Sequence, residues 1–218
     1  GVISADSGHI HVHETGAVEH TGHKIHVVKG ENGKLSAASV EAEAENYRTS
    51  GVKEHITQPK MVYISFPTEY GTLYSKIDGA RMGYGLGAKV NDLKLSDLAA
   101  LADVFYIGGT KCGAMMGEAV VITNNELKDN FRSYMKQNGG MLAKGWTLGL
   151  QFYTLFENDL YFEITGRADK YAMEIREAFE KKGIDFYIDS PTNQQFVLLS
   201  EEQMRKLEKK HIFEYQFP

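Results

Sequence analysis

The sequence has little cysteine and little proline, and it lacks a long apolar segment. Its one cysteine, Cys112, excludes an internal disulfide. Because cysteine-poor chains are typical of reducing compartments, we expect a cytoplasmic protein. Four prolines and no low-complexity tract give no sign of a disordered linker. No apolar run approaches the roughly 20 residues that span a bilayer, which argues against a membrane protein.

Basic residues are also in deficit. The chain has 24 Lys and Arg against 29 Asp and Glu, for a net charge of −5. A negative balance argues against nucleic acid or an anionic membrane surface as the main partner. With 218 residues and 42% hydrophobic content, the chain is long enough and apolar enough for one large domain or two small ones.

Apolar runs and helical patterns alternate along the chain, which predicts an α/β fold. We expect strands over residues 1–5, 25–28, 61–66, 104–107, 119–123, 185–188 and 195–199. We expect helices over residues 36–49, 95–102, 125–137, 142–157 and 167–182, and a last helix that opens at Ser200. A boundary near Phe162 would divide a large domain, 1–162, from a small α+β domain, 163–218.

The connection after the 61–66 strand is too short for a parallel crossover. About ten residues separate it from a second apolar segment that ends at Ile77, and they include Pro67 and Gly71. Parallel neighbours need a connection of a dozen or more residues, usually a helix. Either the two strands pair antiparallel or a crossover helix is missing, which would place a gap between Ser75 and Lys76.

A glycine-rich loop carries the strongest chemical signal. Lys111 lies between Gly109 and Gly113, directly after a predicted buried strand. Most loop lysines are solvated surface charges. However, glycines let the backbone approach a bulky ligand, and α/β proteins bind ligands at strand ends. A lysine with an upstream aspartate, here Asp78, is the pair that a pyridoxal phosphate enzyme needs, the lysine as a Schiff base and the aspartate to keep the ring nitrogen protonated.

Seven of the eight histidines precede residue 56. His9, His11 and His13 alternate, so in a strand they would share one face beside Glu14. This pattern invites a zinc site, but it equally fits a polar strand face with solvated imidazoles. A third interpretation is that one imidazole stacks on an aromatic ligand. The sequence alone gives no convincing metal geometry, and we predict no metal.

Four segments together resemble the low-specificity threonine aldolase family, within the aromatic amino acid beta-eliminating lyase/threonine aldolase superfamily. They are residues 8–17 (GHIHVHETGA), 78–82 (DGARM), 110–117 (TKCGAMMG) and 138–141 (NGGM). They occur in the family's order, and the resemblance runs through nearly the whole chain. The DGAR and TKxGA elements at this separation are specific, whereas the glycine pair is not.

The resemblance implies an aspartate-aminotransferase-like fold (pyridoxal phosphate fold type I), with a mixed, mostly parallel sheet and a homodimer or homotetramer whose active site lies at a subunit interface. It implies pyridoxal 5'-phosphate as cofactor and cleavage of L-threonine or L-allo-threonine to glycine and acetaldehyde. By motif, Lys111 is the Schiff-base lysine and Asp78 pairs with the pyridine nitrogen. Arg81 contacts the cofactor's phenolic oxygen or the substrate carboxylate, His9 stacks on the pyridine ring, and Thr110 contacts the phosphate.

The chain departs from the family pattern in three ways. Glu69 stands where the family often has a histidine, the candidate retro-aldol base, so Glu69 becomes the candidate here. Leu142 follows Gly-Gly-Met where the family has arginine, so that phosphate contact is lost or moved, with Lys144 as a candidate. Family members are also much longer, which predicts that segments are missing at both ends and before Asp78.

Other functions fit some of the same residues. A second pyridoxal phosphate enzyme, either a beta-eliminating lyase or an aminotransferase, would keep the cofactor and change the chemistry. A zinc-dependent hydrolase would use the N-terminal histidines instead. A non-catalytic relic would have lost its cofactor loops. The sequence does not distinguish the physiological substrate or the stereochemistry at Cβ.

Overall fold

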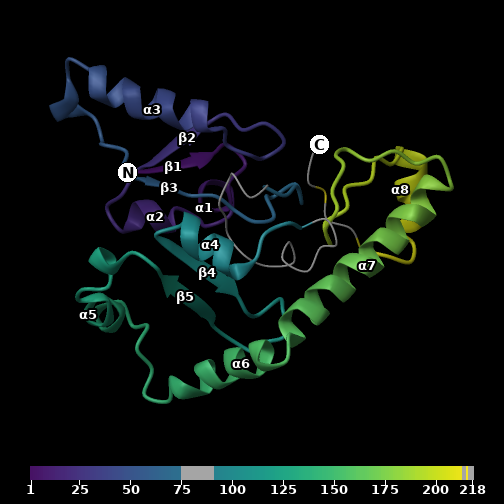
Figure 1. Cartoon of the computed structure of the whole chain (residues 1–218). Coiled ribbons are helices and arrows are strands. Elements are labelled where there is room, and N and C mark those ends of the chain that lie inside the picture. The colour runs from purple at the N-terminus through teal and green to yellow at the C-terminus, as the bar shows by residue number, and fades with distance from the viewer. Residues whose placement is uncertain (75–90, 213–214, 216–218) are drawn as a thin grey trace.

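A three-stranded parallel sheet begins the fold (Figure 1). The computed structural model describes residues 1–74, 91–212 and 215. Its first sheet has the order β2-β1-β3, with Val2 opposite both Ile25 and Met61. The strands are β1 (Val2–Ala5), β2 (Ile25–Val28) and β3 (Met61–Val62). All four residues of β1 are buried, as expected for the central strand of a parallel sheet.

Helical segments connect these strands. Between β1 and β2 lie α1 (His9–Val12) and α2 (Ala17–His20), and between β2 and β3 lie α3 (Ala37–Thr49) and η1 (Lys53–His55). The predicted helix after Ser36 is confirmed, because the Ser36 hydroxyl caps α3 by accepting a hydrogen bond from the Ser39 N–H at 3.1 Å. In Figure 1, α3 lies beside β2.

An antiparallel strand pair forms the second sheet of the described chain. After α4 (Leu95–Leu101), β4 (Val104–Gly108) pairs with β5 (Glu118–Ile122), with Tyr106 opposite Val120. The nine residues 109–117, between the end of β4 and the start of β5, therefore form a closed hairpin loop, and this loop carries Lys111. Both strands were predicted from the sequence, with bounds that differ by one residue at most.

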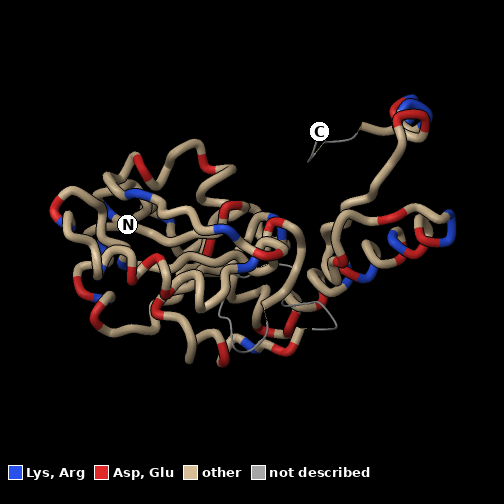
Figure 2. Tube along the Cα trace, turned by 90° about the horizontal axis from the view of Figure 1, so that it is seen from above, with Lys and Arg blue, Asp and Glu red and all other residues tan. Residues whose placement is uncertain are grey.

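The C-terminal half is helical. It contains η3 (Asn125–Leu127), α5 (Phe131–Gln137), α6 (Trp146–Glu157), α7 (Leu160–Glu180) and α8 (Glu201–Leu207). Acidic and basic side chains are mixed along α7 and α8 (Figure 2), and they form pairs four residues apart such as Lys181 with Glu177 and Arg205 with Glu201. These faces are solvated. Ser200 caps α8 through Gln203, which confirms the predicted capping box.

The main hydrophobic core joins the hairpin, the helices and the segment before residue 75. Its buried members are Phe66, Tyr74, Leu93, Leu98, Phe105, Ile107, Cys112, Ala114, Leu155 and Tyr161. Tyr161 also donates a hydrogen bond to the Gly108 carbonyl oxygen at 3.0 Å. The core therefore fixes the end of β4, where the Lys111 loop begins.

Several predicted elements have other bounds. The expected 61–66 strand is paired only at Met61–Val62, and Phe66 is directed into the core instead. The expected 125–137 helix is interrupted at Asn130, whose left-handed φ of 59° ends one segment and starts another. The 185–188 and 195–199 strands reduce to one bridge, Phe186 with Val197. Helix α4 begins at Leu95 as expected and ends one residue early, at Leu101, and the Asp97 carboxylate accepts the Lys94 N–H at 2.9 Å.

Two sequence-based expectations concern boundaries. The proposed gap between Ser75 and Lys76 lies outside the described residues. The domain boundary after Phe162 falls in the first turn of α7 and stays a prediction. Among the described residues, no helix is both long and apolar enough to cross a membrane.

Candidate active site

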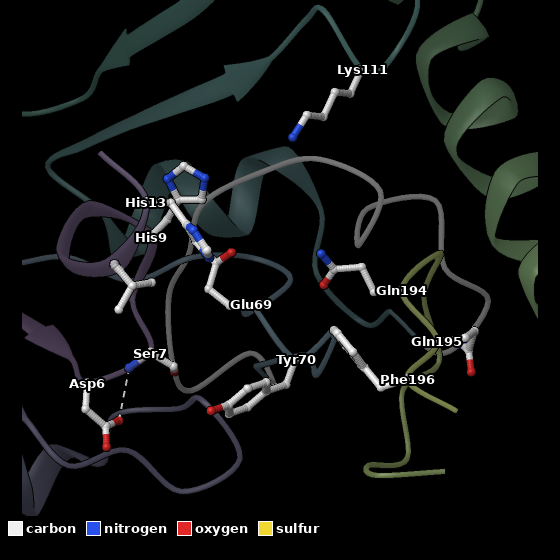
Figure 3. A pocket seen from close by; sticks show the side chains of 11 residues that line it. Asp6, Ser7, His9, His13, Glu69, Tyr70, Lys111, Gln194, Gln195 and Phe196 are labelled. Carbon is white, nitrogen blue, oxygen red and sulfur yellow. Dashed lines mark hydrogen bonds between the residues drawn. The ribbon is translucent and has the colours of Figure 1, made fainter. Parts of the chain in front are cut away.

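A cavity of about 770 Å³ lies where β1 and β4 end (Figure 3). Asp6 and Ser7 follow β1 directly, and Lys111 follows β4. This is the edge at which α/β proteins bind ligands. The lining residues are Asp6, Ser7, His9, Val12, His13, Glu69, Tyr70, Lys111, Gln194, Gln195 and Phe196.

The Lys111 loop is rigidly held by its neighbours. Cys112 is 2% exposed, and its N–H donates to the Gly109 carbonyl oxygen at 2.9 Å. A Cβ at Gly109 would lie 2.5 Å from the Gly117 carbonyl oxygen, so only glycine fits where the two ends of the loop meet. Because Cys112 is anchored in the core, the adjacent Lys111 side chain is turned outward, and its amine is directed into the cavity (Figure 3).

Two histidines line the opposite wall. Residues 9–12 form the short helix α1 and not a strand, with the His13 N–H donating to the His9 carbonyl oxygen at 2.9 Å. Residues four apart share a helix face. His9 and His13 therefore both reach the cavity, with ring centroids 5.3 Å apart, whereas the exposed His11 does not line it.

A compact turn presents Glu69 and Tyr70. The Thr68 N–H donates to the Thr72 carbonyl oxygen at 2.9 Å, and the two threonine hydroxyls lie 2.7 Å apart. Thr68 is 2% exposed, so the turn is anchored at its base while Glu69 and Tyr70 extend from it toward the cavity. Figure 3 shows Glu69 on the same side of the cavity as His9 and His13.

Aromatic rings close the other side. Tyr70 makes edge-to-face contacts with Tyr187 and Phe196, with centroids 6.1 and 6.5 Å apart. Burial raises the pKa of the Tyr70 phenol, and the proximity of Tyr187 and Asp6 raises it further. Tyr70 therefore remains a neutral phenol at physiological pH, able to donate a hydrogen bond at the cavity wall.

One acid of α7 is buried. Asp169 on α7 is 4% exposed, and burial raises the pKa of its carboxyl from 3.8 to about 7, while the backbone N–H of Asn193 lowers it. That N–H is close enough to act electrostatically, but neither carboxylate oxygen has a partner with hydrogen-bond geometry. Burial dominates, because the side chain lies on the buried face of α7 that also carries Tyr161, Thr165 and Ala172.

The structure brings together three of the predicted site residues, Lys111, His9 and Glu69, around one cavity. Thr110 is exposed and is not one of the lining residues, so its phosphate contact stays a prediction. Asp78 and Arg81 lie outside the described residues. The roles of all six residues remain predictions.

Sequence reasoning missed most of the far wall. The predicted 195–199 strand and the residue before it supply three lining residues, Gln194, Gln195 and Phe196. No sequence motif indicates that these residues lie near residues 6 or 70. For Tyr70, the sequence offers one indication of a place in the site, which is its position next to Glu69. For the zinc alternative, the described part of the chain contains no group of three or more His, Cys, Asp or Glu side chains placed to hold a metal ion.

Comparisons with known proteins agree on one family. No family model matches the chain. The low-specificity L-threonine aldolase of Pseudomonas aeruginosa PAO1 is 26% identical over 94% of this chain and 64% of its own length. The enzyme of the same name from Pseudomonas sp. strain NCIMB 10558 is 25% identical over 96% of this chain and 65% of its own.

A solved structure gives the same result for the fold. Threonine aldolase from Leishmania major superposes with a TM-score of 0.90 at 39% identity, covering 96% of this chain and 66% of that one. The chain thus spans slightly less than two thirds of the length of each relative, which agrees with the expectation of missing segments. In sequence and in fold, the chain is a relative of the low-specificity L-threonine aldolases.

Proposed function

We propose that the chain is the greater part of a pyridoxal phosphate-dependent lyase that cleaves L-threonine or L-allo-threonine to glycine and acetaldehyde. One structural observation supports the proposal in addition to the similarity to known threonine aldolases. The amine of Lys111, the lysine that the motif assigns to the cofactor, is directed into the same cavity that His9 and Glu69 line. Three residues chosen for their chemistry, from separate parts of the sequence, thus meet at one place.

The residues present fit the cofactor. It needs a primary amine for covalent attachment, a flat side chain against its ring and space between them. Lys111 supplies the amine from a loop held by buried Cys112, and His9 supplies an imidazole across a cavity of about 770 Å³. By motif, Asp78 would hold the proton on the ring nitrogen, Arg81 would contact the phenolic oxygen or substrate carboxylate, and Thr110 the phosphate.

A few side chains would then share the roles that the reaction requires. When bound, the cofactor supplies an electron sink for the electrons of the broken Cα–Cβ bond. Lys111 would hold the cofactor through Nζ and release it to the substrate amine. The Glu69 carboxylate is our candidate for the base that takes the proton from the substrate's β-hydroxyl. His9 would stack against the cofactor ring, and the aromatic wall of Tyr70 and Phe196 would limit the access of water to that side.

We further propose the assembly and domain division that the family resemblance implies. The active enzyme would be a homodimer or homotetramer with its site at a subunit interface. Residues 1–162 would belong to the large cofactor-binding domain and 163–218 to the small one.

The test is to replace Lys111. We expect Lys111→Ala, and equally Lys111→Arg, to remove the visible absorbance of the bound cofactor and all detectable acetaldehyde release from threonine. Lys128→Ala is the matched control, because Lys128 is an exposed loop lysine paired only locally with Asn125 at 2.7 Å. Borohydride reduction followed by peptide mapping should place the pyridoxyl group on Lys111. A label on another lysine would disprove the assignment.

Product analysis separates the reaction classes. Threonine aldolase chemistry yields glycine and acetaldehyde in equal amounts, whereas beta-elimination or transamination yields a 2-oxo acid. Formation of a 2-oxo acid without acetaldehyde would replace our proposal with one of the other pyridoxal phosphate reactions.

A further inference from the structure

His9 lies beside a carboxylate, that of Glu14. Its Nδ1 lies 2.7 Å from Glu14 Oε1, and the two side chains are 26% and 42% exposed. Glu14 is not one of the residues that line the cavity, whereas His9 is. The imidazole therefore contacts an acid and also borders the space where a ligand would bind.

The local backbone explains how Glu14 reaches back to His9. Helix α1 ends at Val12, and Thr15 and Gly16 adopt left-handed φ values of 51° and 75°. A left-handed Thr is strained by roughly 1–2 kcal/mol. The Ala17 N–H closes this turn on the Glu14 carbonyl oxygen at 2.9 Å. The chain turns immediately after Glu14, so Glu14 lies two residues beyond the end of α1 with its side chain beside His9.

The contact lacks the alignment of a formed hydrogen bond. Nδ1 of His9 is fully buried as an atom and has no partner with hydrogen-bond geometry, although Glu14 Oε1 is within bonding distance of it. A buried imidazole nitrogen costs free energy unless it is paired. Since a small rotation of either side chain would align the pair, Glu14 is the group placed to satisfy that nitrogen.

We propose that Glu14 is a positioning residue that holds the His9 ring in the tautomer with hydrogen on Nδ1 and fixes the plane in which the ring faces the cavity. A carboxylate can only accept a hydrogen bond, so the nitrogen beside it must carry the proton. The second ring nitrogen then keeps its lone pair whenever the ring is neutral. Carboxylate–histidine pairs of this kind set tautomer and orientation in metal sites and in hydrolase triads.

The consequence for function rests on the lyase activity proposed above. Without a hydrogen-bond partner, the imidazole can adopt several ring orientations. A ring that rotates would stack less well on a bound aromatic cofactor. Loss of Glu14 should therefore affect turnover more than substrate affinity. We expect Glu14→Ala to lower kcat about tenfold, the lower end of the range for loss of such a carboxylate at metal sites, with little change in KM. Glu14→Gln should recover part of the loss, because its amide oxygen still accepts from Nδ1.

The tautomer can be observed without any activity measurement. In the purified full-length protein with ¹⁵N-labelled histidine, long-range ¹H–¹⁵N spectra distinguish the two ring tautomers, and His9→Asn identifies the His9 signals. In buffer alkaline enough to keep the ring neutral, we expect the Nδ1–H form in the unaltered protein and in Glu14→Gln, and its loss in Glu14→Ala. Glu19→Ala, an exposed acid on the neighbouring α2, should leave the His9 signals unchanged.

The outcomes separate the two proposals. An Nε2–H tautomer at His9 in the unaltered protein, or one that Glu14→Ala does not change, would overturn the role of Glu14 whatever the enzyme does. An Nδ1–H tautomer that depends on Glu14, in a protein that never cleaves threonine, would support the pair and disprove the lyase.

Discussion

Ser190 Oγ donates a hydrogen bond to the Gly71 carbonyl oxygen at 3.1 Å, across 119 positions of sequence. Thr192 Oγ1 donates to the same oxygen at 3.2 Å. Both hydroxyl residues are fully buried. This junction connects the turn that presents Glu69 and Tyr70 with the segment that presents Gln194 to Phe196, so two walls of the cavity are fastened to each other at a single carbonyl group.

Gly71→Ala should therefore disrupt the junction. Gly71 has φ = 72°, and a Cβ there would lie 2.2 Å from Ser190 Oγ. The left-handed backbone alone costs about 1–2 kcal/mol for a residue with a side chain. The collision adds to that cost, so we expect more than about 2 kcal/mol of destabilisation in a denaturant titration, together with loss of ligand binding.

Gly22→Ala is the matched control for this substitution. Gly22 has φ = 83°, but a Cβ there would meet no atom within 4 Å. It isolates the backbone cost, roughly 1–2 kcal/mol, from the collision. Equal losses in the two variants would show that the Gly71 junction does not constrain the cavity walls.

Asp169 should make stability depend on pH. Its carboxyl titrates near 7 in the folded protein because of burial, and near 3.8 when unfolded. Between these values the folded protein retains a proton that the unfolded chain has released. The contribution of Asp169 to the free energy of unfolding therefore falls as pH rises from about 4 to about 7, by at most about 1.4 kcal/mol per pH unit. Above about pH 7 this contribution no longer changes with pH.

Asp169→Asn tests the prediction, because the amide cannot ionise. We expect the variant to gain stability relative to the parent as pH rises through this interval, measured by urea unfolding at a series of pH values. Asp185→Asn, on a carboxyl that is not buried, is the control. A difference between parent and Asp169→Asn that stays constant from pH 4 to 7 would contradict the burial effect.

The elements that could be predicted from sequence are those with a strong local cause. The helix after Ser36 and the helix after Ser200 begin where a capping side chain is available, and the strands around Lys111 are continuous apolar runs. Lys111, His9 and Glu69 were identified from their chemistry and from motif resemblance, and the structure places all three at one cavity.

What could not be predicted depends on contacts between distant segments. Nothing local indicates that Phe196 packs against Tyr70 or that Ser190 bonds to Gly71. In a strand, the alternating His9, His11 and His13 would share one face, but a spacing of two is weak evidence over five residues. The α1 turn forms because Gly8 starts it and the His13 N–H closes it, and the resulting period places His9 and His13 on one face.

Leu98 should dominate the stability of α4. Its side chain is fully buried in the main core, whereas Leu101 on the same helix is 51% exposed. Leu98→Ala should cost about 2–5 kcal/mol in thermal or denaturant unfolding, because it removes apolar contacts and leaves a cavity. Leu101→Ala should cost less than about 1 kcal/mol. Similar losses for the two would mean that α4 is not packed by its Leu98 face.

Glu69 provides the most direct test of the chemical step. Its carboxylate lines the cavity beside His9 and His13, on a turn fixed by the buried Thr68. If Glu69 takes the β-hydroxyl proton, Glu69→Gln keeps the shape and removes the base, so kcat for threonine should fall about 10²- to 10⁴-fold with a small change in KM. The absorbance of bound cofactor should persist, because Lys111 is untouched. Glu54→Gln, an exposed acid in η1, should be indistinguishable from the parent. Full activity in Glu69→Gln would transfer the role of base to another lining group, with His13 the first to replace.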